Sequence, residues 1–257
     1  MHIYWLVALA IIGLINGLNF FIAKTKNDVR WLDILWPLNF LGVGILLLII
    51  HRLTMSQSFP AQHFVVIFLS IWALRQVRYL FRRQKRFTLS TRHDQDNKMP
   101  SNLLSIYIKE TLLAYALSIM LIIVLAYPIE TTFLRNIGLF IGSVIVVLGF
   151  LIEMVADQQL RNFKYRLEME GRVLKTGLFQ YTRHPNYFGE TLMWIGLFVI
   201  VVTNSEPIIQ FVSIISPIVM ITYSLTSQRI YNNENHLSNN EEYQAYKNKT
   251  NRFFPWI

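Results

Sequence analysis

The sequence predicts an all-α protein of seven membrane-spanning helices. Hydrophobic residues make up 53% of its 257 residues and charged residues only 15%, whereas soluble domains carry about 25% charged residues. The apolar residues form continuous runs, most of them about as long as the 20 or so residues that a bilayer core requires. Because the runs do not alternate with polar residues, helices satisfy the backbone in lipid better than the strands of a barrel.

The apolar runs follow one another along a single membrane domain, expected over residues 1–257 with a polar tail at 227–257. The first run lacks a small-residue cleavage site and is expected to be a retained helix. The sixth is short and becomes longer if Pro185 and Asn186 join it; proline is favoured in a first helical turn. A short amphipathic helix is expected at Glu241–Lys249 in the tail. The membrane helices are expected at about Ile3–Ala23, Trp31–Ile50, His63–Phe81, Leu103–Tyr127, Phe133–Val155, Tyr187–Val202 and Pro207–Thr226.

Basic residues are segregated to one side of this map. Of the 24 Lys and Arg residues, 21 fall in the tail or in and next to the connections after helices one, three and five, and the exceptions are Arg52, Lys109 and Arg135. The positive-inside rule makes that side cytoplasmic, with the N-terminus outside and the C-terminus inside. The net charge of +9 therefore reflects membrane topology rather than nucleic-acid binding. The absence of cysteine excludes thiolate chemistry, and the histidines lack metal-ligand spacing, so no metal site is expected.

The most informative stretch is Thr182–Glu190, where a basic loop becomes an apolar helix. Asn186 and Glu190 are four residues apart and share a helix face. A carboxylate at the mouth of a membrane helix is costly without partners, which indicates a functional site. As a lone histidine, His184 is more typical of a hydrogen-bonding loop residue than of a catalyst.

Two further groups of polar residues need an explanation. Glu153, Asp157 and Arg161 recur at steps of four and form one stripe, which either binds a polar cofactor or satisfies itself by ion pairing. The loop Arg161–Arg183 carries six basic residues. Arginine forks bind phosphates in pairs of hydrogen bonds, although membrane topology alone also favours a basic loop here. The chain has no Rossmann or P-loop fingerprint, so a nucleotide would be held by helix ends and loops.

The stretch Thr182–Glu190 resembles the signature of a superfamily of integral-membrane enzymes. This superfamily includes steroid 5α-reductases, sterol C14 reductases, isoprenylcysteine carboxyl methyltransferases and an uncharacterised bacterial branch. The resemblance is strongest over Gly149–Trp194 and weaker over Glu242–Trp256. It implies that NADPH is bound by Arg75, Glu153, Asp157, Arg161, Arg172, Arg183, His184, Asn186, Tyr187, Glu190 and Arg229.

The second helix departs from the 5α-reductases. Those enzymes have a Gln-Glu pair between a Trp and a Pro spaced like Trp31 and Pro37, and the present chain has Ile34 and Leu35 there. Asp33 is the nearest acid and is the candidate catalytic residue; its alternative role is to cap or anchor the helix start. As an acid it would have to carry a proton, which a desolvated site favours. The partner Tyr on helix three is expected to be replaced by Trp72.

The resemblance implies NADPH-dependent reduction of a carbon–carbon double bond in a steroid-like or isoprenoid lipid. The lipid would enter from the bilayer, and the nucleotide would bind at the cytoplasmic face of a bacterial inner membrane. One alternative is an S-adenosylmethionine-dependent isoprenylcysteine-type methyltransferase, and another is a non-catalytic lipid-binding membrane protein. The order Gly189-Glu190 and the Arg-rich loops favour the reductase. No nucleic-acid partner is expected, and the sequence leaves the oligomeric state open.

Overall fold

The protein is an all-helical membrane protein, as the sequence predicts. The computed structural model describes residues 2–54, 60–87, 102–127, 132–164, 172–203, 207–226, 234–235 and 237–255, and these residues contain no strand. Among them, seven helical spans are long and apolar enough to cross a membrane. The chain divides into two compact units: unit 1 comprises Met1–Arg135 and Val201–Ser216, and unit 2 comprises Asn136–Ile200 and Pro217–Ile257.

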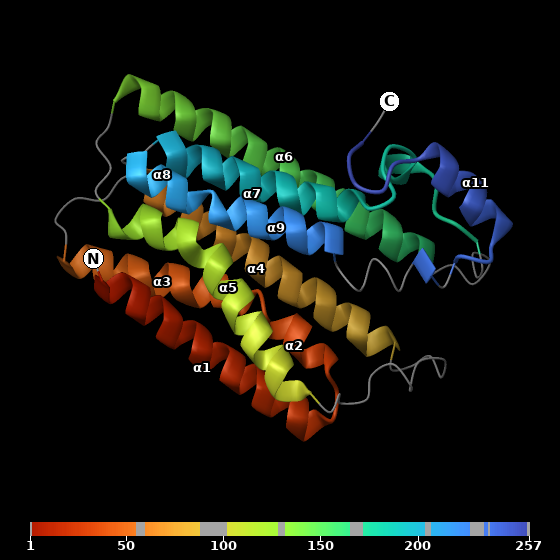
Figure 1. Ribbon diagram of the computed structural model, residues 1–257, viewed down its shortest axis with the longest axis horizontal. Coiled ribbons are helices and arrows are strands. Elements are labelled where there is room, and N and C mark those ends of the chain that lie inside the picture. Colours follow the sequence, from red (N-terminus) through yellow and green to blue (C-terminus); the bar gives the residue numbers. More distant parts are fainter. Residues whose placement is uncertain are drawn as a thin grey trace. The chain divides into compact units, whose positions relative to one another are not determined.

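Unit 1 is a helix bundle built around α5. In it α1 packs against α3 and α5, α3 packs also against α4 and α5, and α8 contacts α5 (Figure 1). The second half of α5 is buried on all sides, from Leu117 to Ala126, because helices surround it. The helices of this unit are α1 (His2–Lys26), α2 (Arg30–Leu35), α3 (Leu38–Thr54), α4 (Pro60–Phe87), α5 (Leu103–Ala126) and α8 (Pro207–Ser213).

The expected second helix is broken into α2 and α3 by a turn at Trp36-Pro37. Pro37 has no N–H to donate to the carbonyl of Asp33, four residues earlier. The side chain of Asn39 donates a hydrogen bond of 2.8 Å to the carbonyl of Trp36, which satisfies the backbone at the break. The last span is also broken near a proline. Pro217, like Pro37, has no N–H to donate, and a turn at Ile214 separates α8 from α9 (Ile215–Thr226).

Buried polar side chains fasten the helices of unit 1 to one another. His51 bonds the carbonyl of Leu125 through Nδ1 at 2.8 Å, and Gln62 donates to the carbonyl of Val124 at 3.0 Å. These contacts supply partners to carbonyls in the last turn of α5, which the helix itself cannot pair. In the bundle, Asn39 also donates to Asn16 at 2.8 Å. Such side-chain bonds hold helices together where lipid offers no hydrophobic driving force.

Unit 2 is organised by a close backbone contact between α6 (Phe133–Lys164) and α7 (Pro185–Thr203), which lie side by side (Figure 1). A Cβ added at Gly149 would lie 2.5 Å from the backbone nitrogen of Met193, and one added at Gly189 would lie 2.5 Å from that of Glu153. Two turns away, Gly142 and Gly196 meet in the same way. Since Gly149 faces Gly189 and Gly142 faces Gly196, the helices run antiparallel, and small residues allow them to touch.

The remaining elements of unit 2 pack around this helix pair. Thr191 of α7 and Ser224 of α9 are hydrogen-bonded at 3.2 Å between their buried hydroxyl groups. A short 3-10 helix, η2 (Gly177–Gln180), lies in the connection between α6 and α7. The expected tail helix is confirmed as α11 (Glu241–Lys249), capped by Asn240, whose side chain accepts a hydrogen bond of 3.0 Å from the backbone N–H of Tyr243.

Substituting the contact glycines is expected to destabilise unit 2. In Gly149→Ala and Gly189→Ala the new methyl group would collide with backbone atoms, which cannot rotate away as a flexible side chain can. Overpacking of this kind costs about 1–3 kcal/mol or more. We expect a lower melting temperature for each variant in detergent. The matched control is Gly13→Ala in α1, where an added Cβ meets nothing within 4 Å and alanine is the better helix former; equal melting temperatures for all three variants would contradict the contact.

Candidate functional site

The tail of unit 2 folds back onto the connection between α6 and α7. Tyr243 and Tyr246 of α11 are buried together with Val173. The hydroxyl of Tyr246 donates a hydrogen bond to the carbonyl of Phe179 in η2. At the rim Lys175 pairs with Glu242 at 2.6 Å. The tail is therefore a packed part of the unit that brings its side chains to the start of α7.

Three contacts fix the backbone just before α7. The side chain of Gln159 on α6 accepts a hydrogen bond of 2.9 Å from the N–H of Leu178, next to Gly177, whose φ of +66° suits glycine. Thr182 donates its hydroxyl to the carbonyl of Phe253 at 2.9 Å, and the N–H of Arg183 donates to the carbonyl of Asn251 at 2.9 Å. The stretch that the sequence marks as functional is thus held between α6 and the tail.

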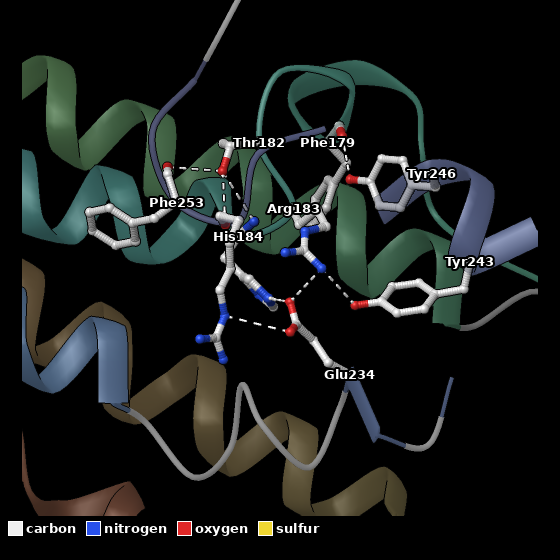
Figure 2. A network of polar contacts seen from close by, with 9 residues as sticks. Phe179, Thr182, Arg183, His184, Glu234, Tyr243, Tyr246 and Phe253 are labelled. Carbon is white, nitrogen blue, oxygen red and sulfur yellow. Dashed lines mark hydrogen bonds and ion pairs between the residues drawn. The ribbon is translucent and has the colours of Figure 1, made fainter. Parts of the chain in front are cut away.

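A cluster of charged side chains converges on Glu234 at this point, and we call it the Glu234 cluster. His184 Nε2 lies 3.0 Å and Arg183 Nη1 lies 3.1 Å from the same carboxylate oxygen, Oε1. Arg252 Nε lies 3.5 Å from the other oxygen. Arg183 Nη1 also donates to the hydroxyl of Tyr243 at 3.1 Å. Figure 2 shows Arg183 and His184 directed at this one carboxylate, with the hydroxyl of Tyr243 bonded to Arg183.

The environment of Glu234 favours its ionised form. Burial raises the pKa of this carboxyl, but the hydrogen bond from His184 and the charges of Arg183, His184 and Arg252 outweigh burial, and the pKa lies below its ordinary value. The neighbouring hydroxyl of Tyr243 responds in the opposite direction, since burial and the charge of Glu234 raise its pKa. The centre of the cluster is accordingly a carboxylate surrounded by cations, with neutral phenols beside it.

The close helix contact places acidic residues of α6 against the first turns of α7. Glu153 and Asp157 are buried, with 2% and 4% exposure. The backbone of Glu153 is the part of α6 that Gly189 contacts. Glu190, the next residue, is half-buried on α7. The two acids of the stripe predicted from the sequence, Glu153 and Asp157, are therefore buried beside a helix–helix contact.

The structure places the other residues of the predicted nucleotide site as follows. Asn186 and Tyr187 lie in the first turn of α7 and are half-buried, and the ring of Tyr187 lies edge-on to that of His184. Arg161 is half-buried near the end of α6 and donates to the side chain of Gln158. Arg172 is exposed on the connection that follows. Arg229 lies outside the described residues.

Asp33 and Arg75 belong to unit 1, on α2 and α4, and both are half-buried. At the start of α2 another acid, Asp28, contacts the backbone and the side chain of Arg30. Asp28 accepts a hydrogen bond of 3.0 Å from the N–H of Arg30 and pairs with its guanidinium at 2.8 Å. Trp72, expected at the place of the missing Tyr, is buried on α4 against the ring of Phe40.

Sequence reasoning missed Glu234, Tyr243 and Arg252. These residues lie in a tail rich in Asn and Glu. The sequence pattern there does not distinguish one acid from its neighbours. Glu234 is 50 residues beyond His184, so only the folding of the tail reveals their pairing. The weak resemblance across the tail was the one available hint, and it did not extend to Glu234.

Comparisons with known proteins confirm the family resemblance. Residues 19–250 match DUF1295, a family described as "Protein of unknown function", and the chain belongs to this family. The matched region contains both α6 and α7 and most of the Glu234 cluster.

Three relatives match shorter stretches. A 124-residue stretch is 31% identical to an uncharacterized protein of Schizosaccharomyces pombe, covering 41% of this chain and 36% of the relative. A 55-residue stretch is 38% identical to 3-oxo-5-alpha-steroid 4-dehydrogenase 1 of Bos taurus, covering 21% of each chain. A 114-residue stretch is 31% identical to protein-S-isoprenylcysteine O-methyltransferase of Dictyostelium discoideum, covering 42% of this chain and 45% of the relative. The matches thus span less than half the length of each relative.

The stabilisation provided by Glu234 is expected to depend on pH. Because folding lowers the pKa of this group from 4.5, its contribution is complete well above that value and is lost as the pH falls through the folded value. Losing hydrogen bonds to charged partners costs about 1.5–3 kcal/mol. Glu234→Gln should therefore melt below the wild type at neutral pH, and the difference should shrink as the pH falls below 4.5 toward the lower pKa of the folded protein.

The control for this measurement is Glu241→Gln, which changes an exposed acid of α11 and should melt like the wild type throughout. A difference between Glu234→Gln and the wild type that stays constant from neutral to acid pH would show that the carboxylate charge contributes nothing.

Proposed function

We propose that this member of the DUF1295 family is a membrane-embedded reductase that uses NADPH to reduce a carbon–carbon double bond in a steroid-like or isoprenoid lipid. The nucleotide would bind unit 2 from the cytoplasm, at the inner membrane of a bacterium, and the lipid would arrive from the bilayer. The observation that carries the proposal is the Glu234 cluster, in which Arg183, His184 and Arg252 surround one anion beside the start of α7.

The donors of this cluster fit phosphate groups, of which NADPH has three. Arginine binds phosphate through two parallel N–H groups, and among the described residues the Nε atoms of Arg183 and Arg252 are buried without a hydrogen-bond partner. The N-terminus of α7 adds the positive end of a helix dipole, which favours an anion. Asn186 and Tyr187 in its first turn would orient the nucleotide. NADPH itself would supply the hydride, and the protein would supply binding, orientation and exclusion of water.

A second candidate function is methyl transfer from S-adenosylmethionine. The match to the methyltransferase relative covers 42% of this chain, twice the share matched by the steroid dehydrogenase. In addition, a carboxylate, the one anionic group of S-adenosylmethionine, already fits the Glu234 cluster. The two candidates differ in the anion that they present, so binding measurements separate them.

NADPH is expected to raise the melting temperature of the purified protein more than NADH or S-adenosylmethionine does, because a ligand that binds the folded state stabilises it by mass action. Asn186→Ala should weaken NADPH binding about tenfold, the effect of losing one buried hydrogen-bonding partner. The matched control is Asn248→Ala, which changes an exposed asparagine of α11. Stabilisation by S-adenosylmethionine alone would establish the second candidate, and a response to none of the three would favour a non-catalytic lipid-binding protein.

Asp33 is proposed as the acid that polarises the substrate carbonyl. At the start of α2 the N–H of Arg30 donates to Asp28, so this one capping contact does not require Asp33. Asp33→Asn should retain NADPH binding and lower turnover by about a hundredfold or more. Turnover is followed as loss of NADPH absorbance with a panel of lipid enones. The control Asp28→Asn should lower the melting temperature but leave turnover close to that of the wild type; full turnover in Asp33→Asn would exclude Asp33 as the acid.

A further inference from the structure

The Glu234 cluster has more hydrogen-bond donors than its carboxylate uses. Oε1 is shared by His184 and Arg183, while the Nε of Arg252 lies 3.5 Å from Oε2, which is too distant for a good hydrogen bond. Within the described part of the chain, the Nε atoms of Arg183 and Arg252 are both buried and have no hydrogen-bond partner. A buried N–H without an acceptor is costly, so the cluster is incompletely satisfied by Glu234.

The charges are unbalanced in the same direction. Two guanidinium groups and a histidine face one carboxylate, which leaves a positive excess. The side chain of Arg183 is only 9% exposed, so solvent screens little of its charge. A phosphate group carries up to two negative charges and three or more acceptor oxygens, and it matches the arginine fork better than a single carboxylate does.

We propose that Arg183, His184 and Arg252 form a phosphate-binding site that Glu234 occupies in the ligand-free protein and vacates when a phosphate group binds. Glu234 is thus an internal competitor of the ligand. The proposed function enters only in naming NADPH as the source of the phosphate; the site itself follows from the donors and charges around Glu234.

The backbone that carries Arg183, His184 and Arg252 is held by contacts that do not involve Glu234. The backbone of Arg183 is hydrogen-bonded to the carbonyl of Asn251 at 2.9 Å, and Thr182 bonds the carbonyls of Arg252 and Phe253 at 3.2 and 2.9 Å. The tyrosines of α11 hold the tail through their own burial and through the hydrogen bond of Tyr246 to Phe179 (Figure 2). Displacing Glu234 therefore breaks the contacts of one side chain and leaves the fold of the site intact.

Competition of this kind has a measurable consequence. The apparent affinity for the ligand equals the affinity of the vacant site multiplied by the fraction of molecules in which the site is vacant. Occupation by Glu234 lowers that fraction and therefore weakens ligand binding. Removing the carboxylate should therefore tighten phosphate binding even though it destabilises the ligand-free protein. If Glu234 instead positioned Arg183 and His184 for the ligand, the same substitution would weaken binding. The two roles predict opposite signs.

The test measures binding of inorganic pyrophosphate and NADPH to the full chain in detergent by calorimetry. Glu234→Gln should bind pyrophosphate about tenfold more tightly than the wild type, and Arg252→Gln should bind it more weakly. The matched control is Glu242→Gln, which removes an ion-paired acid of the same tail outside the cluster and should bind like the wild type. Equal or weaker pyrophosphate binding by Glu234→Gln overturns the proposal. Glu234→Asp, which keeps the charge on a shorter side chain, should give an intermediate affinity and serves if Glu234→Gln does not fold.

The source of the phosphate is tested separately. NADPH should follow pyrophosphate and bind more tightly to Glu234→Gln. If pyrophosphate binding tightens but neither protein binds NADPH, the proposed function fails and the phosphate site stands; binding of vesicles that contain phosphatidic acid, stronger for Glu234→Gln, would then identify a lipid headgroup as the source. If NADPH binds the wild type and Glu234→Gln does not tighten it, the proposed function stands and the competitor role is refuted.

Discussion

The close backbone contact between α6 and α7 is the constraint on which the candidate site depends. Gly149 and Gly189 meet without side chains between them, and Gly142 and Gly196 repeat the contact two turns away. In a bilayer, where burial of apolar surface gives little driving force between helices, such approach is a main source of association. The contact fixes the register of the two helices and so sets Glu153 of α6 against the start of α7.

The site is completed by a tail that forms its own small core. Tyr243 and Tyr246 are buried against Val173, and hydrogen bonds of Thr182 and Arg183 to the backbone of residues 251–253 close the arrangement. Apolar burial and backbone hydrogen bonds therefore position the tail. The charged side chains of the Glu234 cluster are not needed for this and can bind a ligand. This division explains how Glu234 can stabilise the ligand-free protein and still be displaced without unfolding unit 2.

Unit 1 satisfies polar groups inside the membrane by a different means. His51, Gln62, Asn16 and Asn39 are all buried, and each bonds a carbonyl or another side chain of the bundle. An unpaired polar group in hydrocarbon costs several kcal/mol, roughly, so these residues fix which helices are neighbours. The break at Pro37 fits this scheme because Asn39 bonds the carbonyl of Trp36.

The sequence by itself determined the all-helical membrane class, the seven spans, a helix start near Pro185 and the family, because apolar run length and a local motif are readable along one chain. The family resemblance also placed Arg183 and His184 among the candidate cofactor-binding residues. The sequence could not identify their partner, since Glu234 is 50 residues away and its pairing depends on the fold of the tail. Likewise Gly149 and Gly189 are ordinary residues of two separate helices, and only the tertiary structure decided that they touch, because helix register is set by packing in three dimensions and not by periodicity.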